Sequence, residues 1–259
     1  MKVCSLASSS KGNCTIVYND NEILVVDMGI TFKEFEEKIN LLKLNLDNVI
    51  GAIVSHEHID HVKGLTNFYK FLGKPIYCHY NSCEGVMKRT KLPASAFVRF
   101  DSGFKLGSFE IQPFEVSHDV FCVGYNILEN SNKVSIVTDL GYTTNAVVEK
   151  LYDSRLVILE ANHDEKMLVA GNYPAILKSR ILSKKGHLSN VSSAKVVAQL
   201  AQHNVRQILF AHLSEENNTP EVCYNTICSY LESLGISPQV NIKLDIAKPH
   251  GVGPIFVIK

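Results

Sequence analysis

Apolar and polar residues alternate in short runs along the first third of the chain, a pattern that predicts strands joined by tight turns. One longer segment spaces Phe32, Phe35 and Ile39 at helical intervals, and Thr31 stands where a helix cap is favoured. The continuous apolar run over residues 51–55 is typical of a strand buried on both faces. We expect strands over residues 2–7, 15–18, 23–27, 51–55 and 75–78, and helices over residues 31–42 and 64–72.

The rest of the chain alternates apolar strands with helical segments, the order expected of a layered α/β protein. No repeat, linker or low-complexity tract interrupts this pattern, so residues 1–259 are expected to form one compact domain. Between Asp139 and His212 the pattern indicates one strand, one loop and two helices. We expect strands over residues 109–116, 121–128, 134–138, 156–159 and 207–211 and again after residue 240, and helices over residues 144–151, 191–203 and 220–234.

Several of the predicted buried strands end in a polar residue that can bind a metal or titrate. Asp139, Glu160 and His212 each follow such a strand, and another strand continues directly into His56. Ligand sites of layered α/β proteins gather where strand ends meet loops. We therefore expect the functional site to be built from these residues.

The strongest chemical signal is the segment Ser-His-Glu-His-Ile-Asp-His over residues 55–61. His56, His58, Asp60 and His61 lie so close together that, without a cation, they would repel one another when protonated or leave unsatisfied donors when buried. Neutral imidazole and carboxylate are the ligands that divalent metals prefer. The alternative is a solvated histidine-rich loop that binds metal only adventitiously.

Two metal ions need more ligands than this segment supplies, and His118, Asp139 and His212 are the candidates. Singly, a histidine after a strand is more often structural and an aspartate there more often caps a helix. Together they complete a ligand count that leaves an open position on each ion, as catalytic sites require. The expected sets are His56, His58 and His118 for one ion, Asp60, His61 and His212 for the other, and Asp139 bridging the two.

Composition and charge narrow the function classes. The chain has 26 basic and 26 acidic side chains, which argues against a strongly basic nucleic-acid coat but allows a local basic patch. Seven cysteines without a Cys-x-x-Cys motif do not form a disulfide framework, and no apolar run is long enough for a signal peptide or a membrane helix. We therefore expect a cytoplasmic protein without a membrane partner.

The His-x-His-x-Asp-His motif, followed by His118, Asp139 and His212 at later strand ends, resembles the metallo-β-lactamase fold superfamily over nearly the whole chain. This resemblance implies a four-layer αββα sandwich in which residues 8–13 and 25–29 flank the metals. The segments that follow resemble the phosphodiesterase and nuclease branch, and most closely the YycJ (WalJ)-like subfamily, whose members look like DNA exonucleases acting from 5′ ends. There is no room for the β-CASP domain of larger nucleases. The segments concerned are residues 159–164, 186–190 and 211–218.

The resemblance implies a phosphodiesterase with two divalent ions, either Zn²⁺ or Mn²⁺, with iron as a further possibility. A metal-bridged hydroxide would attack the phosphodiester, and Asp60 would accept or orient its proton. His187 would donate a proton to the leaving oxygen, with Glu160 orienting its ring and raising its pKa. Alternatively, His187 is only a polar loop residue at the start of a helix.

Ser214 and Asn217 are candidates for holding a phosphate oxygen, and Lys184, in the one local basic cluster, for following a nucleic-acid backbone. Helix capping and a solvated loop are equally good explanations for these residues. The expected partner is DNA rather than RNA; the alternatives are an RNA-processing nuclease, a small-molecule cyclic phosphodiesterase and a non-catalytic metal-binding module. The pattern leaves the native metal, the cleavage polarity and the oligomeric state open. The remaining histidines are expected to be structural: His79, His163, His203 and His250.

Overall fold

The computed structural model describes all 259 residues, and the chain divides into two compact units. Unit 1 comprises Met1–Gln112 together with Lys248–Lys259, and unit 2 comprises Pro113–Ala247. Each unit has its own hydrophobic core, formed where helices cover the strands of a β-sheet. None of the helices combines the length and apolar character that crossing a membrane requires. The single domain expected from the sequence stays a prediction.

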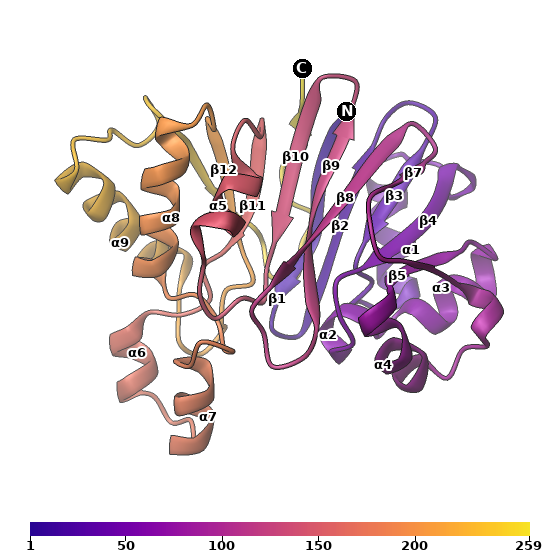
Figure 1. Ribbon diagram of the computed structural model, residues 1–259, viewed down its shortest axis with the longest axis horizontal. Coiled ribbons are helices and arrows are strands. Elements are labelled where there is room, and N and C mark those ends of the chain that lie inside the picture. Colours follow the sequence, from indigo (N-terminus) through magenta and orange to yellow (C-terminus); the bar gives the residue numbers. More distant parts are fainter. The chain divides into compact units, whose positions relative to one another are not determined.

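Unit 1 contains a sheet of strand order β14-β1-β2-β3-β4-β5-β6, antiparallel from β14 to β3 and parallel from β3 to β6. The strands of this sheet are β1 (Lys2–Ser9), β2 (Gly12–Tyr18), β3 (Ile23–Val26), β4 (Val49–Val54), β5 (Ile76–His79), β6 (Phe97–Phe100) and β14 (Phe256–Val257). Unit 1 also contains β7 (Phe104–Leu106), which is outside this sheet and pairs with residues 109–111. Its helices are α1 (Phe32–Leu41), α2 (Ile59–Val62), α3 (Leu65–Leu72) and α4 (Tyr80–Thr90). Figure 1 shows α1 and α3 beside the parallel strands β4 and β5.

The structure confirms the capped helix predicted near residue 31. Thr31 Oγ1 accepts a hydrogen bond from the Glu34 backbone N–H at 3.2 Å, and the Glu34 carboxylate accepts one from the Thr31 N–H at 3.0 Å. Phe32, Phe35 and Ile39 are the buried face of α1. In contrast, α4 was not predicted, because its segment is polar and holds a glycine at its centre.

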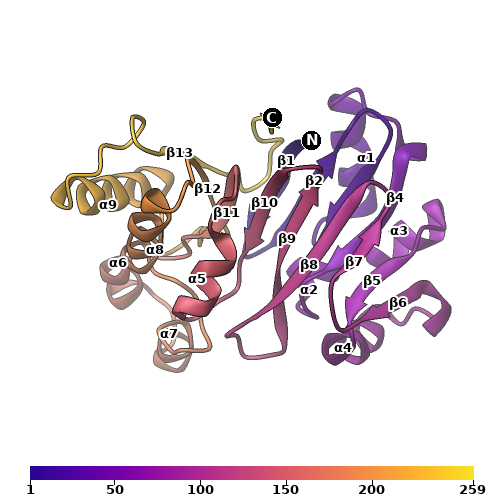
Figure 2. The same cartoon turned by 45° about the horizontal axis from the view of Figure 1, so that its top comes forward.

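Unit 2 has strand order β13-β12-β11-β10-β9, with β8 next, and the strands from β10 to β13 are parallel. Its strands are β8 (Phe109–Val116), which begins in unit 1, β9 (Cys122–Glu129), β10 (Asn132–Val137), β11 (Leu156–Glu160), β12 (Gln207–Ala211) and β13 (Lys243–Ile246). Its helices are α5 (Asn145–Leu151), α6 (Glu165–Ala170), α7 (Ala175–Ile181), α8 (Asn190–Gln202) and α9 (Pro220–Ser233). Figures 1 and 2 both show α8 and α9 beside β11 and β12.

The stretch between Asp139 and His212 corrects one expectation. It holds four helices, α5 to α8, rather than two, while β11 is the single strand that precedes β12. The two helices that were not predicted are α6 and α7. Helix α6 buries only Leu168, and α7 buries no residue, so neither has an apolar face that the sequence pattern could reveal.

The buried parallel strands position the candidate site. All five residues of β11 are buried, and so are the last four of β4, β10 and β12. The carboxyl ends of neighbouring parallel strands meet at one edge of a sheet. In each unit, the polar residues that follow these strands are therefore held at the end of a rigid apolar core.

Candidate metal centre

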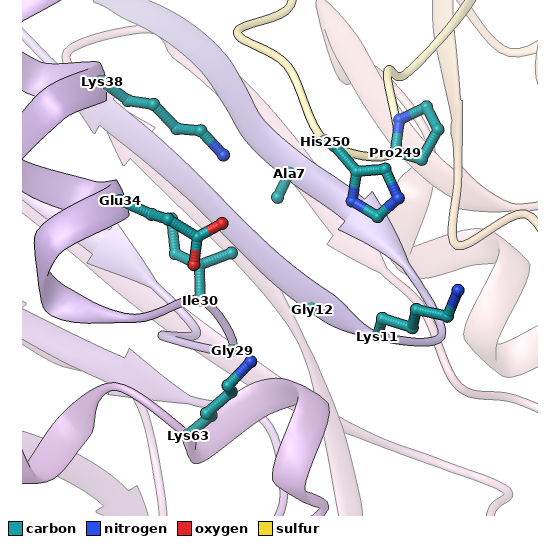
Figure 3. Close-up of a pocket in the computed structure, with 10 residues that line it drawn as sticks. All are labelled: Ala7, Lys11, Gly12, Gly29, Ile30, Glu34, Lys38, Lys63, Pro249 and His250. Atoms are coloured by element: carbon teal, nitrogen blue, oxygen red, sulfur yellow. The ribbon is translucent and has the colours of Figure 1, made fainter.

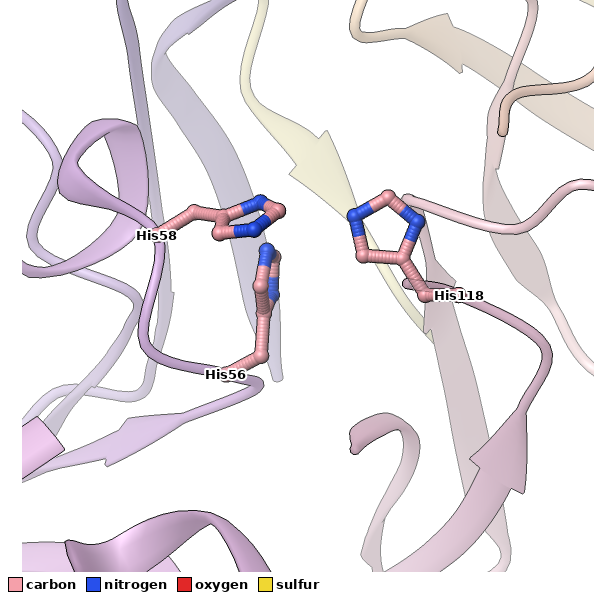
Figure 4. Close-up of side chains that lie close together, drawn as sticks. All are labelled: His56, His58 and His118. Atoms are coloured by element: carbon pink, nitrogen blue, oxygen red, sulfur yellow. The ribbon is translucent and has the colours of Figure 1, made fainter. Parts of the chain in front are cut away.

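In unit 1 the candidate ligands follow β4 on one short loop that runs into α2. His56 and His61 are fully buried, whereas His58 and Asp60 are half-buried. The ring centroid of His56 lies 4.6 Å from that of His58 and 4.3 Å from that of His61. Figure 4 shows the His56 and His58 rings turned toward each other. The loop thus gathers three imidazoles and a carboxylate.

Two neighbouring segments of unit 1 hold this loop in place. Asp27, directly after β3, accepts a hydrogen bond from the Ser55 N–H at 2.8 Å through Oδ1, and its Oδ2 lies 2.7 Å from His61 Nδ1. The side-chain amide of Asn13 donates to Asp60 Oδ2 at 3.2 Å and lies 3.1 Å from His61 Nε2. The resemblance located these two segments, but the individual contacts are known only from the structure.

Glycine is the one residue type that fits at position 29, between the end of β3 and the ligand loop. A Cβ atom at this position would lie 1.6 Å from the backbone oxygen of Asp60 and 2.6 Å from the backbone nitrogen of Asn13. Any side chain would therefore push Asp60 away from the position that the loop gives it.

In unit 2 the candidate ligands come from three different strand ends. His118 follows β8, Asp139 follows β10 and His212 follows β12, and all three are buried. His118 is the ring drawn on the loop after β8 in Figure 4. Asp139 Oδ1 lies 3.9 Å from His118 Nε2 and 3.6 Å from His212 Nδ1. The fold of unit 2 therefore brings together residues that are far apart in the sequence.

Glu160 is the centre of the hydrogen bonds in unit 2. Its Oε1 lies 2.8 Å from both His187 Nδ1 and His212 Nδ1, and its Oε2 accepts the backbone N–H groups of Leu140 and Leu188, each at 3.1 Å. Burial alone would raise the pKa of Glu160, but the charge and hydrogen bond of His187 and those of His212 lower this pKa to about 2. Glu160 is thus an anion that orients a candidate ligand as well as His187. The sequence predicted only the contact with His187.

The imidazoles share a pattern that fits metal binding. In four of the five candidate histidine ligands, Nδ1 contacts a protein group, which leaves Nε2 to donate its lone pair. The Nδ1 contacts are His56 to Ser55 Oγ at 3.0 Å, His61 to Asp27 Oδ2 at 2.7 Å, His118 to Gly186 O at 3.2 Å and His212 to Glu160 Oε1 at 2.8 Å. Metal-binding histidines typically donate their other ring N–H to a carboxylate or a backbone carbonyl. The donor set in each unit therefore suits a divalent cation.

Backbone strain marks the same strand ends. Of the nine non-glycine residues with positive φ, six are exposed and only three are buried: Asp27 at 57°, Asp139 at 60° and His212 at 58°. A non-glycine residue in this conformation costs about 1–3 kcal/mol and persists mainly where function requires it. The three strained positions thus coincide with two candidate ligands and with the carboxylate that orients His61.

The candidate substrate residues Ser214, Asn217 and Lys184 are placed as follows. Ser214 Oγ accepts a hydrogen bond from the Asn217 backbone N–H at 3.1 Å, so this hydroxyl helps to form the loop after β12. The Lys184 ammonium lies 5.7 Å from the centre of the Tyr142 ring. The proposed role of all three in binding substrate stays a prediction.

His163, which the sequence left as a structural residue, lies three residues after Glu160. It is only 1% exposed, and neither ring nitrogen has a hydrogen-bond partner. Burial lowers its pKa from 6.5 to about 4, although the nearby Glu160 carboxylate acts in the opposite direction. His163 is therefore a neutral imidazole in the folded protein at neutral pH.

Comparisons with known proteins show similarity over most of the chain. The family model of the Beta-lactamase superfamily domain matches residues 24–213. The chain is 32% identical over 234 residues to exodeoxyribonuclease YycJ of Bacillus anthracis, with 89% of each chain covered. It is 27% identical over 263 residues to exodeoxyribonuclease WalJ of Streptococcus pneumoniae, with 99% of this chain and 98% of the relative covered.

A solved structure shares the fold. The metallo-β-lactamase fold protein YhfI of Bacillus subtilis matches with a TM-score of 0.73 at 19% identity, and the match covers 98% of both chains. At this level of identity, the likeness describes the arrangement of helices and strands only.

Proposed function

Because the chain belongs to the Beta-lactamase superfamily and is a hydrolase, we propose that it is a dinuclear metal-dependent phosphodiesterase that removes nucleotides from the 5′ ends of DNA. Its similarity to relatives named exodeoxyribonucleases supports DNA as the substrate. The observation that carries the hydrolytic part is the Glu160–His187 pair beside Asp139. The side chain of His187 is 17% exposed, compared with 2% for His212, so it is the imidazole of unit 2 that a substrate can reach.

In this proposal the candidate ligands predicted from the sequence would hold two metal ions. One ion would be held by His56, His58 and His118, the other by Asp60, His61 and His212, with Asp139 between them. The ions, which by ligand type are Zn²⁺, Mn²⁺ or iron, would supply an activated water and neutralise charge on the phosphate oxygens.

The protein's own groups would move the protons. The Glu160 carboxylate, whose Oε1 lies 2.8 Å from His187 Nδ1, would orient this ring so that its Nε2 side can give a proton to the leaving oxygen. Asp60, whose Oδ2 accepts from the Asn13 amide, would accept or orient the proton of the attacking water. The DNA strand would be held by Ser214, Asn217 and Lys184. We expect the enzyme to act in the cytoplasm.

The zero net charge supports a second candidate, a phosphodiesterase for small cyclic phosphates. Binding that spans several phosphates weakens steeply with salt, whereas binding to one phosphate does not. The test measures the Kd at 50 and at 200 mM salt. Over this range the Kd should rise little for the small-molecule enzyme and by an order of magnitude or more for the nuclease, depending on the number of phosphate contacts.

The test is metal analysis followed by digestion of DNA labelled at the 5′ or the 3′ end. We expect the protein loaded with Mn²⁺ or Zn²⁺ to release nucleotides from the 5′ end, and Asp139→Ala to abolish the release. Asp20→Ala is the matched control, because the Asp20 side chain is 89% exposed and pairs with Lys2 at the surface of unit 1. If metal-loaded protein cleaves neither DNA, RNA nor bis-p-nitrophenyl phosphate, the proposal is wrong.

A further inference from the structure

An aromatic ring and a lysine lie at the surface of unit 2, close in the sequence to Asp139 and His187. Tyr142 follows Asp139 by three residues, and Lys184 precedes His187 by three. Tyr142 is 41% exposed, and the Lys184 ammonium lies 5.7 Å from the centre of its ring. Single exposed apolar side chains are common on protein surfaces, so exposure alone indicates no function. What distinguishes Tyr142 is how the backbone before it is held.

Glu160 links the segment that leads to Tyr142 with the ring of His187. Its Oε2 accepts the Leu140 N–H at 3.1 Å, and its Oε1 lies 2.8 Å from His187 Nδ1. Leu140 is only two residues before Tyr142, and consecutive Cα atoms are about 3.8 Å apart. One carboxylate therefore holds both the backbone next to Tyr142 and the imidazole that is proposed to give a proton to the leaving oxygen.

Gly141 packs the same segment against the turn that carries Lys184. The Gly141 N–H donates to the Ser117 carbonyl at 2.9 Å, and the Ser117 hydroxyl donates to the Lys184 carbonyl at 2.8 Å. A Cβ atom at position 141 would lie 2.4 Å from the Lys184 carbonyl and 2.6 Å from the Gly186 nitrogen, so only glycine permits this contact. Tyr142 thus follows a backbone that is held on both sides, directly beside the turn that leads to the candidate acid.

Other cation–ring pairs of the protein lack this position. The Arg99 guanidinium lies 5.5 Å from the centre of the Tyr80 ring, and Tyr80 is 61% exposed, but neither is within three residues of a candidate site residue. The same is true of the pairs Lys2–Tyr18 and Lys70–Phe71. Among these pairs, Lys184–Tyr142 is the one that flanks the proposed chemistry.

A basic cavity in unit 1 offers charge without a phenyl ring. Figure 3 shows this cavity, of about 220 Å³, with Lys11, Lys38, Lys63 and His250 among the residues that line it. The Nζ atom of Lys38 is buried there and has no hydrogen-bond partner. None of the lining residues is a phenylalanine or a tyrosine, the rings on which bases commonly stack. The combination of ring and charge that a nucleotide needs is therefore better met at Tyr142.

From this arrangement, and resting on the proposed nuclease function, we propose that Tyr142 is a stacking platform for an unpaired base of the DNA strand, next to the phosphodiester that is cleaved. Every base has a π-face, so a tyrosine ring binds bases with little preference for sequence, as an enzyme that removes successive nucleotides requires. The Lys184 ammonium is near the limit of about 6 Å for contact with the ring, so little is lost when it turns toward a phosphate of the same strand.

The test uses single-stranded oligonucleotides of one sequence that either carry all their bases or lack the base of one of the first three nucleotides. The quantity measured is the ratio of kcat/KM for the complete strand to kcat/KM for the abasic strand, on the metal-loaded protein. Loss of one stacked base predicts a ratio of roughly 5- to 100-fold at one of these positions, expressed mainly in KM. Tyr142→Leu should bring this ratio toward one, whereas Tyr142→Phe should retain most of it.

Tyr80→Leu is the matched control. It removes an exposed tyrosine ring that also lies beside a cation, Arg99, but in unit 1 and away from the candidate site residues in the sequence. This variant should keep the wild-type ratio. Because Tyr142 is exposed, Tyr142→Leu is expected to fold, and its thermal unfolding midpoint should stay close to that of the wild type.

Equilibrium binding in EDTA supplies a readout that does not depend on hydrolysis. By fluorescence anisotropy, Tyr142→Leu should raise the Kd for the complete strand but not for the abasic strand that gave the largest ratio. A protein that hydrolyses DNA with the same ratios in the wild type and in Tyr142→Leu would overturn the stacking platform and leave the proposed function intact. Recognition of the base that depends on Tyr142 in EDTA, without hydrolysis when metal is added, would support the platform and count against the proposed function.

Discussion

The two units supply their candidate ligands in opposite ways. In unit 1 they all follow one strand, β4, within the segment His56 to His61, and β3 and the β1–β2 turn merely hold them. In unit 2 each ligand follows a different strand, β8, β10 or β12. A local segment keeps its ligands together through chain connectivity alone, whereas the set in unit 2 exists only once the parallel strands have paired.

The supporting carboxylates differ in the same way. Asp27 contacts one imidazole, His61, and the Ser55 loop residue. Glu160 contacts two imidazoles and two backbone N–H groups, and it is fully buried. Unit 2 therefore depends on a single side chain far more than unit 1 does, and substitutions in the two units should reveal this asymmetry.

The largest effect is expected at Asp139. Its Oδ1 lies within 3.9 Å of ring nitrogens of His118, His187 and His212, so its loss disturbs every imidazole of the unit 2 set. Asp139→Ala should lower kcat/KM for DNA by on the order of 10³-fold, since a lost metal contributes several kcal/mol to the transition state. Elemental analysis of the same sample should find less metal per chain. A loss below tenfold would contradict the assigned role.

The next effect sets Glu160 against Asp27. Substitution of a group that orients a metal-binding histidine typically costs 10- to 100-fold in activity or metal affinity. We expect Glu160→Gln to lower kcat/KM by roughly 100-fold and Asp27→Asn by roughly tenfold, because Glu160 orients two rings. Both amide variants preserve size. Equal losses in parallel assays at fixed metal concentration would refute the asymmetry between the units.

The smallest effect concerns acid stability and arises in unit 2. The pKa of His163 is 6.5 in the unfolded chain and about 4 in the folded protein, so its contribution is fully present above pH 6.5 and is lost as the pH falls toward 4. Between pH 7 and pH 5 this amounts to roughly 2 kcal/mol of unfolding free energy. Urea unfolding of the metal-free protein measures it.

His163→Gln removes the titrating group and should reduce the loss of stability between pH 7 and pH 5 by about that amount. His203→Gln is the matched control, because His203 is exposed and stacks on Tyr152 with centroids 3.7 Å apart. If both variants show the same pH dependence as the wild type, His163 is not the source of the acid sensitivity.

The features that could be predicted from the sequence are those that depend on neighbouring residues in the chain. The capped helix α1 and most strands were predicted, and the α/β class and the metallo-β-lactamase fold are confirmed. The double role of Glu160 could not be predicted, because it follows from strand register: Glu160 pairs with Ala211, which places His212 beside its carboxylate. Similarly, Lys38 has the spacing of a solvated helix residue, and only the packed structure places its ammonium group in a cavity.

The return of residues Lys248–Lys259 to unit 1 has a consequence for how the protein is made. This segment pairs β14 with β1, and the Gly253 N–H donates to the Ser5 carbonyl at 2.9 Å. During translation, the first 112 residues leave the ribosome with the outer edge of β1 uncovered, and the whole of unit 2 is synthesised before that edge can close. Because His250 belongs to this segment, the cavity lined by Lys11, Lys38, Lys63 and His250 is also completed only when the last part of the chain emerges.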